Sequence, residues 1–122
     1  MKKILLTLIA ALITTSSAFA ADTSPKTVIH VINVKWKADA TPAQISKVLD
    51  VVSSLPSQNA GITRVWTNPI KKQLPEGYNT VIVMEFVSQD ALKTYVGSPA
   101  QNKFYDVYMP IREESRTSDI SN

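Results

Sequence analysis

One histidine, one tyrosine and one glutamine are the residues of this chain best suited to chemistry at a shared site. His30 is the only histidine and stands in a run of valine and isoleucine. Its imidazole titrates near neutral pH and could act as a general base. The residues alone favour a core histidine that donates to a backbone carbonyl. Tyr95 carries a hydroxyl that needs a partner once buried, and Gln101, just after the Pro99 break, could point to the same place. These three are the candidate catalytic residues.

Metal and nucleotide chemistry find little support in the sequence. The chain has no cysteine and one histidine, so a zinc or non-haem iron site is not expected. The lack of cysteine also excludes disulfides and a thiol nucleophile. A phosphate-binding glycine loop and a Gly-x-Ser-x-Gly elbow are both absent. A Ser-His-Asp set stays open, although nothing local supports one. We therefore expect no metal and no cofactor.

The first twenty residues have the pattern of a secretory signal peptide. Two lysines precede an apolar stretch over 4–13, and Ala18-Phe19-Ala20 forms an Ala-x-Ala end. The stretch is much shorter than the roughly 20 residues that span a bilayer as a helix. A buried N-terminal helix or an anchor is the alternative. We expect a signal peptide over 1–20 with cleavage after Ala20, a polar lead-in over 21–26 and a mature domain over 27–122.

The composition predicts a small exported domain with no nucleic-acid partner. Two of the 13 basic residues lie in the signal segment, so the mature domain is nearly neutral against its 10 acidic residues. The basic residues are scattered, which argues against nucleic-acid binding. No long basic amphipathic helix indicates a membrane surface. We expect a periplasmic or secreted protein without membrane contact once the signal is removed.

Apolar periodicity predicts a strand–helix–strand–strand–helix–strand order with a third helical piece. This order is typical of a ferredoxin-like α+β sandwich. Thr41 and Pro42 mark the start of the first helix, and Pro56 marks its end. The expected strands are 27–37, 62–67, 80–87 and 116–121, and the expected helices are 42–56, 89–96 and 99–108.

Helices on one face of such a sheet leave the other face uncovered. An uncovered apolar sheet face is a liability for a monomer, so we predict a homodimer. Glu85 on this face is expected to be an interface carboxylate paired with Arg64 or Lys35. The aromatic residues Trp36, Trp66, Tyr105 and Tyr108 are expected to serve packing. The uncovered face is expected to carry Ile29, Val31, Val81, Val83 and Glu85, opposite the helix-facing Ile82, Met84 and Phe86.

Three stretches together resemble the stress-responsive dimeric α/β-barrel (Dabb) family. They are VIHVINVKWK at 28–37, GYNT at 77–80 leading into VMEF at 83–86, and LKTYVGSPAQ at 92–101. The resemblance runs from about 27 to 121. It implies a ferredoxin-like βαββαβ protomer whose sheet pairs with a second copy to form a homodimeric α/β barrel.

The resemblance also implies roles for individual residues. In the plant polyketide cyclase of this family, a strand histidine, a helix tyrosine and a second histidine line a helix–sheet pocket. They promote an aldol ring closure without metal or cofactor. By similarity His30 corresponds to the first histidine and Tyr95 to the tyrosine, whereas Gln101 replaces the second histidine. A glutamine can hydrogen-bond a carbonyl or a phenol but cannot shuttle a proton near neutral pH.

Two functions follow from the residues and the resemblance. The favoured one is non-enzymatic, a stress-response or binding protein whose pocket takes a small apolar or aromatic molecule. The alternative is a cofactor-independent enzyme, cyclase-like or monooxygenase-like, in which His30 is the base and Tyr95 and Gln101 polarise a carbonyl. An open cavity shared by His30 and Tyr95 favours the enzyme, and a filled one favours the structural role. The expected ligand contacts are His30, Leu49, Val52, Met84, Tyr95 and Gln101.

Overall fold

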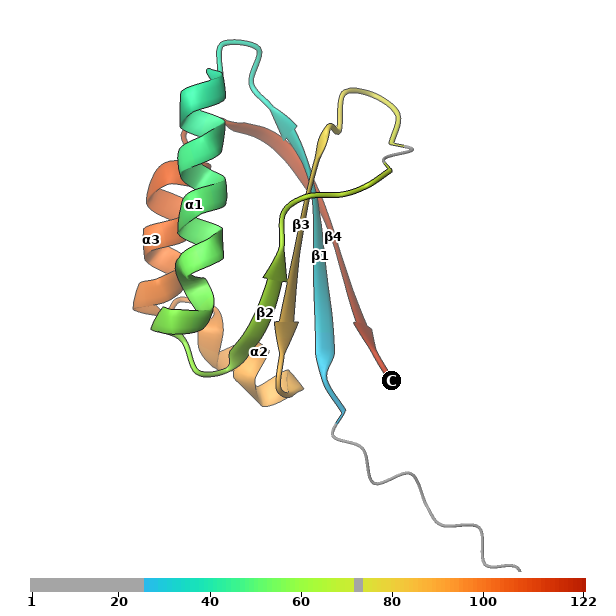
Figure 1. Ribbon diagram of the computed structural model, residues 1–122, viewed down its shortest axis with the longest axis vertical. Helices are drawn as coiled ribbons and strands as arrows, with labels where there is room; N and C mark the ends of the chain where they lie inside the picture. The colour runs from blue at the N-terminus through green and yellow to red at the C-terminus, as the bar shows by residue number, and fades with distance from the viewer. Residues whose placement is uncertain (1–25, 72–73) are drawn as a thin grey trace, which may run out of the picture.

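Four antiparallel strands form one sheet, and three helices lie on one of its faces (Figure 1). The computed structural model describes residues 26–71 and 74–122. The strand order is β2-β3-β1-β4, that of a ferredoxin-like α+β fold, as predicted. The expected signal peptide lies outside the described residues. No helix within them is long and apolar enough to cross a membrane. The elements are β1 (Val28–Trp36), α1 (Pro42–Gln58), β2 (Ile62–Trp66), β3 (Thr80–Phe86), α2 (Gln89–Tyr95), α3 (Pro99–Tyr108) and β4 (Arg112–Ser121).

Each helix begins at a hydroxyl side chain that accepts a hydrogen bond from the first turn. Thr41 forms a capping box with Gln44 at the start of α1. Ser88 accepts from the Ala91 N–H, and Ser98 accepts from the Gln101 N–H. These caps satisfy N–H groups that have no partner within the helix. The caps of α2 and α3 thereby fix where Tyr95 and Gln101 stand.

Two predicted boundaries are wrong. The first helix continues past Pro56 to Gln58, and the Asn59 N–H still bonds the Leu55 carbonyl at 2.9 Å. Leu55 is fully buried, so packing holds the last turn in spite of the hydrogen bond that the proline removes. The last strand begins at Arg112 rather than 116. Pairing along the whole of β1 extends it, since strand pairing overrides the weak β propensity of its polar residues.

The core lies between the sheet and the helices. The predicted helix-facing residues of β3 are fully buried, and Trp36 of β1 is 7% exposed. Trp36 also donates from Nε1 to the Thr80 hydroxyl at 2.7 Å, which satisfies its only polar atom. The largest fully buried side chains are Phe86, Phe104, Leu55, Ile82, Met84, Val34, Val48 and Val52.

The opposite face of the sheet carries the apolar residues that the alternation predicts. Ile29, Val31 and Val83 alternate with the core positions of their strands and are half-buried in the protomer. Glu85 on this face pairs with Arg64, Oε1 to Nε at 3.1 Å, as one of the two predicted pairings. Trp66 is 43% exposed, so its predicted packing role is wrong within the protomer. Its partner strand position is Val83 on the uncovered face, where no helix reaches it.

Candidate functional site

A cavity of about 330 Å³ lies between α2, α3 and the β1–β4 half of the sheet. Its size falls within the range of small-molecule sites. We call it the helix–sheet cavity. The helices and β1 contribute mostly apolar and aromatic side chains, whereas β4 contributes polar ones. The predicted candidate residues His30, Tyr95 and Gln101 all line it. The structure therefore brings together three residues that lie far apart in the sequence.

His30 is paired with a carboxylate on the neighbouring strand. Its Nδ1 lies 2.5 Å from Oδ1 of Asp119, the residue directly opposite it in the β1–β4 register. The His30 side chain is 18% exposed and the Asp119 side chain 49%. A backbone carbonyl was the expected partner, and that expectation is wrong because the β4 register places a carboxylate there. Nδ1 is occupied, so Nε2 is the ring nitrogen left to meet a ligand.

Two buried tyrosine hydroxyls add polar groups to the cavity. Tyr95 and Tyr108 are each 2% exposed. Within the described residues, the Tyr95 hydroxyl makes no hydrogen bond. Burial raises the pKa of both hydroxyls, and for Tyr95 the rise is large. Both therefore stay protonated near neutral pH and can donate a hydrogen bond to a carbonyl or hydroxyl oxygen.

Gln101 is engaged in holding the turn between α2 and α3. Its Oε1 accepts from the Gly97 N–H at 2.6 Å, and its Nε2 donates to the Tyr105 hydroxyl at 3.3 Å. Gly97 has φ 78°, a left-handed conformation that glycine adopts at little cost. Tyr105 is 39% exposed and lines the cavity, so its predicted place in the core is wrong. Tyr108 is buried in the core, as predicted.

The wall that β4 supplies is polar along its length. The cavity is lined by Arg112, Ser115 and Thr117. Asp119 is the next alternate residue of β4 after Thr117 and lies opposite His30 in the strand register. Arg112 lies with its guanidinium carbon 5.6 Å from the Tyr108 ring centroid, and its Nη1 donates to the Ser115 hydroxyl at 3.2 Å. In the part of the chain that the structure describes, α1 packs closely against β2 at one end of the sheet, and no helix packs as closely against β4 at the other. Its inner face is therefore free to carry polar side chains.

The remaining predicted ligand contacts do not line the cavity. Val52 and Met84 are fully buried in the core. Leu49 packs against that core from α1. Leu49 and Val52 belong to α1 and Met84 to β3, whereas the cavity is lined by α2, α3, β1 and β4. The predicted residue set therefore divides between a packed half of the helix–sheet layer and an open half.

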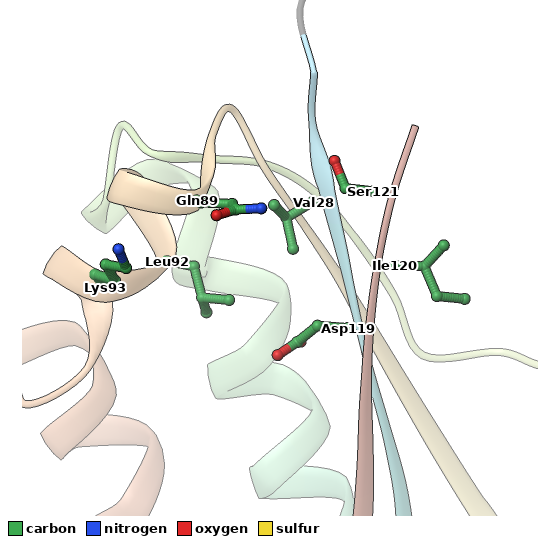
Figure 2. Close-up of a pocket in the computed structure, with 7 residues that line it drawn as sticks. All are labelled: Val28, Gln89, Leu92, Lys93, Asp119, Ile120 and Ser121. Carbon is green, nitrogen blue, oxygen red and sulfur yellow. The ribbon is translucent and has the colours of Figure 1, made fainter.

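A second pocket of about 280 Å³ lies next to the cavity, at the ends of β1 and β4. Figure 2 shows Leu92 and Asp119 in the space between α2 and the sheet, whereas Ile120 projects from the other side of β4. Leu92 lines both pockets, and Asp119 lines this one while its partner His30 lines the other. The His30–Asp119 pair thus separates the two spaces.

Comparison with known families agrees with this fold. The sequence profile of the stress responsive A/B barrel domain, Dabb, matches residues 28–122. The chain belongs to the Dabb family. The resemblance that the strand and helix motifs predicted is confirmed. Among curated proteins, none is significantly similar to this Dabb chain in sequence.

Solved structures share the fold at low sequence identity. The chain is similar to a hydroxynitrile lyase from Passiflora edulis, with a TM-score of 0.72, 14% identity and coverage of 81% of this chain and 95% of the other. A dimeric ferredoxin-like protein from Thermobifida fusca has a TM-score of 0.68 and 15% identity, with coverage of 80% of this chain and 92% of the other. A Dabb family protein from Mesorhizobium loti has a TM-score of 0.64 and 21% identity, with coverage of 78% of this chain and 95% of the other. These likenesses concern the fold, and they include proteins described as dimeric.

Sequence reasoning missed the β4 side of the site. Asp119 and Arg112 were not among the predicted residues, because the strand sequence REESRTSDIS has no apolar alternation to reveal its inner face. One signal could have found Asp119. In a ferredoxin-like sheet the last strand pairs with the first, so a residue near the chain's end must face His30.

Proposed function

We propose that this Dabb domain binds a small apolar or aromatic molecule that carries a carbonyl or hydroxyl oxygen. The observation that carries the proposal is the Tyr95 hydroxyl, which is buried beside the cavity and has no partner within the described residues. An unpaired buried hydroxyl costs about 1–3 kcal/mol, and a ligand oxygen would recover that cost. His30 Nε2 offers a second polar contact, while Phe104 and Leu92 offer apolar surface.

The binding site is proposed to work outside the cytoplasm and in a homodimer. The signal-peptide pattern of residues 1–20 supports export. The half-buried valines and isoleucine of the uncovered sheet face support pairing with a second copy. Dimeric proteins of the same fold, from Thermobifida fusca and Bacteroides fragilis, add support. Pairing through this face leaves the helix–sheet cavity of each protomer accessible, because the cavity lies on the other side of the sheet.

The proposal is tested by titrating the protein with the neutral probe 2-naphthamide in a calorimeter. We expect one site per protomer in the wild type. Thr117→Phe fills the cavity from β4 and is expected to abolish binding. Asn102→Phe places the same ring on the exposed side of α3 and is expected to leave binding unchanged. Circular dichroism is used to check that both variants fold. Equal binding by both variants, or none by the wild type, contradicts the proposal.

A second candidate function is cofactor-independent proton transfer, which is favoured by the open cavity that His30 and Tyr95 share and by the His30–Asp119 contact. A carboxylate on Nδ1 fixes the tautomer of a histidine and leaves Nε2 to exchange a proton with a substrate, as in acid–base sites. The hydroxynitrile lyase from Passiflora edulis demonstrates that this fold can hold a lyase. The probe is 2-tetralone, whose α-protons exchange with deuterated water. Exchange accelerated by the wild type and lost in His30→Asn supports catalysis, and equal rates in the two proteins exclude His30 as a base.

A further inference from the structure

Arg112 is a cationic side chain at the cavity without an acidic partner. In the part of the chain that the structure describes, ion pairs join Lys35, Arg64 and Arg116 to glutamates, and none involves Arg112. Its Nε is buried and makes no hydrogen bond there. Its contacts are the Tyr108 ring and the Ser115 hydroxyl, which are both neutral. The guanidinium is therefore partly removed from water without a counter-charge.

The surroundings of Arg112 favour an anion over a cation or a neutral group. The residues that line the cavity include no aspartate or glutamate. The carboxylates of β4 are engaged with other residues: Glu113 pairs with Lys35, and Glu114 pairs with Arg116. Asp119 bonds His30 and lines the neighbouring pocket. The Ser115 hydroxyl bonds the guanidinium, and the Thr117 hydroxyl lines the same cavity further along β4. A partly desolvated guanidinium is stabilised most by a carboxylate, whose two oxygens match its planar fork.

We propose that the ligand of the helix–sheet cavity is a small apolar or aromatic carboxylate. Its carboxylate binds Arg112, with Ser115 and Thr117 as further donors. Its apolar body lies against Phe104, Ile32 and Leu92, which line the same cavity. This assignment rests on the proposed binding function and names its ligand class. The assignment also orients the ligand. Arg112 of β4 pairs with Trp36 at the end of β1, whereas His30 lies near the start of β1.

The test compares 2-naphthoate with the isosteric neutral probe 2-naphthamide, by calorimetry near neutral pH. We expect the wild type to bind naphthoate about tenfold or more tightly, the effect of one charge-assisted hydrogen-bonded pair. Arg112→Met is expected to remove this preference, because it should weaken naphthoate binding about tenfold more than naphthamide binding. Arg112→Lys keeps the positive charge but lacks the planar guanidinium, so it is expected to retain part of the preference for naphthoate. Lys103→Met, the same charge change on the exposed face of α3, is the matched control.

A second measurement keeps the test valid if Arg112→Met folds poorly. Added sodium chloride screens a charge pair, so it should weaken naphthoate binding to the wild type and leave naphthamide binding unchanged. Equal affinities of the two probes for the wild type, or an unchanged preference in folded Arg112→Met, overturn the carboxylate assignment. If naphthamide still binds the wild type and Thr117→Phe abolishes that binding, the proposed binding function stands although the carboxylate assignment fails. No binding of either probe overturns both.

Discussion

The Asp119 carboxylate meets His30 Nδ1 at 2.5 Å across the β1–β4 pair, although 89 positions separate the two residues in the chain. The contact fixes which imidazole nitrogen faces the cavity. It also joins the last strand to the first through side chains as well as backbone. Because Asp119 is half exposed and His30 mostly buried, the pair stands at the boundary between solvent and the cavity.

A double-mutant cycle measures this contact. Asp119→Asn and His30→Asn are each expected to lower the free energy of unfolding, and the coupling between them should be about 1 kcal/mol. Chemical denaturation near neutral pH provides the measurement. Asp50→Asn removes an exposed carboxylate from α1 and serves as the control. A coupling energy near zero would mean that the two side chains do not interact in solution.

The raised pKa of the Tyr95 hydroxyl predicts how the free energy of unfolding changes at alkaline pH. Burial raises the pKa of its hydroxyl above the ordinary value of 10.0. The unfolded chain therefore ionises first as the pH rises, and folding stability falls above 10.0. Below that value the contribution is fully present. Thermal unfolding across this range should show a smaller alkaline loss in Tyr95→Phe than in the wild type. Identical slopes in Tyr95→Phe and the wild type refute the assignment.

Gln101 is predicted to act on the turn between α2 and α3. Gln101→Ala leaves the Gly97 N–H without its acceptor, so the free energy of unfolding should fall by about 1–2 kcal/mol. The neighbouring Asn102→Ala changes an exposed side chain and should have little effect. Denaturant titration of both variants decides the matter. An equally small loss in the two variants would show that the hydrogen bond contributes nothing measurable.

The uncovered sheet face is predicted to mediate self-association. Val31→Lys places a charge at the middle of this face, and burying an unpaired charge is costly. We expect the wild type to be a dimer by light scattering and the variant to dissociate at least about tenfold more readily. Ser46→Lys on the exposed side of α1 should remain dimeric. A monomeric wild type at micromolar concentration contradicts the dimer.

Local signals predicted most of the fold. The helix start at Thr41 and Pro42, the break at Pro99 and the alternation in β1 and β3 predicted nearly every element where the structure has it. Pro56 misled because the buried Leu55 holds the helix through it. Such packing joins distant segments and leaves no trace in the residues around the proline.

The site was predicted in part, for a related reason. His30 and Tyr95 stand in strongly patterned elements, so the sequence indicates which way they face. Asp119 and Arg112 belong to a polar strand whose inner face emerges only from its register with β1. Met84 has the right pattern for the helix-facing side but is fully buried in the core and does not line the cavity. Periodicity thus identifies a face, and tertiary packing decides which part of that face stays open.

The most direct test of ligand binding is a crystal structure of the protein purified from the exported fraction of the cells that make it. We expect electron density for a small molecule beneath α2 and α3, with a polar atom within hydrogen-bond reach of the Tyr95 hydroxyl or His30 Nε2. A cavity filled by the protein's own side chains would contradict it, as would His30 and Tyr95 facing separate spaces.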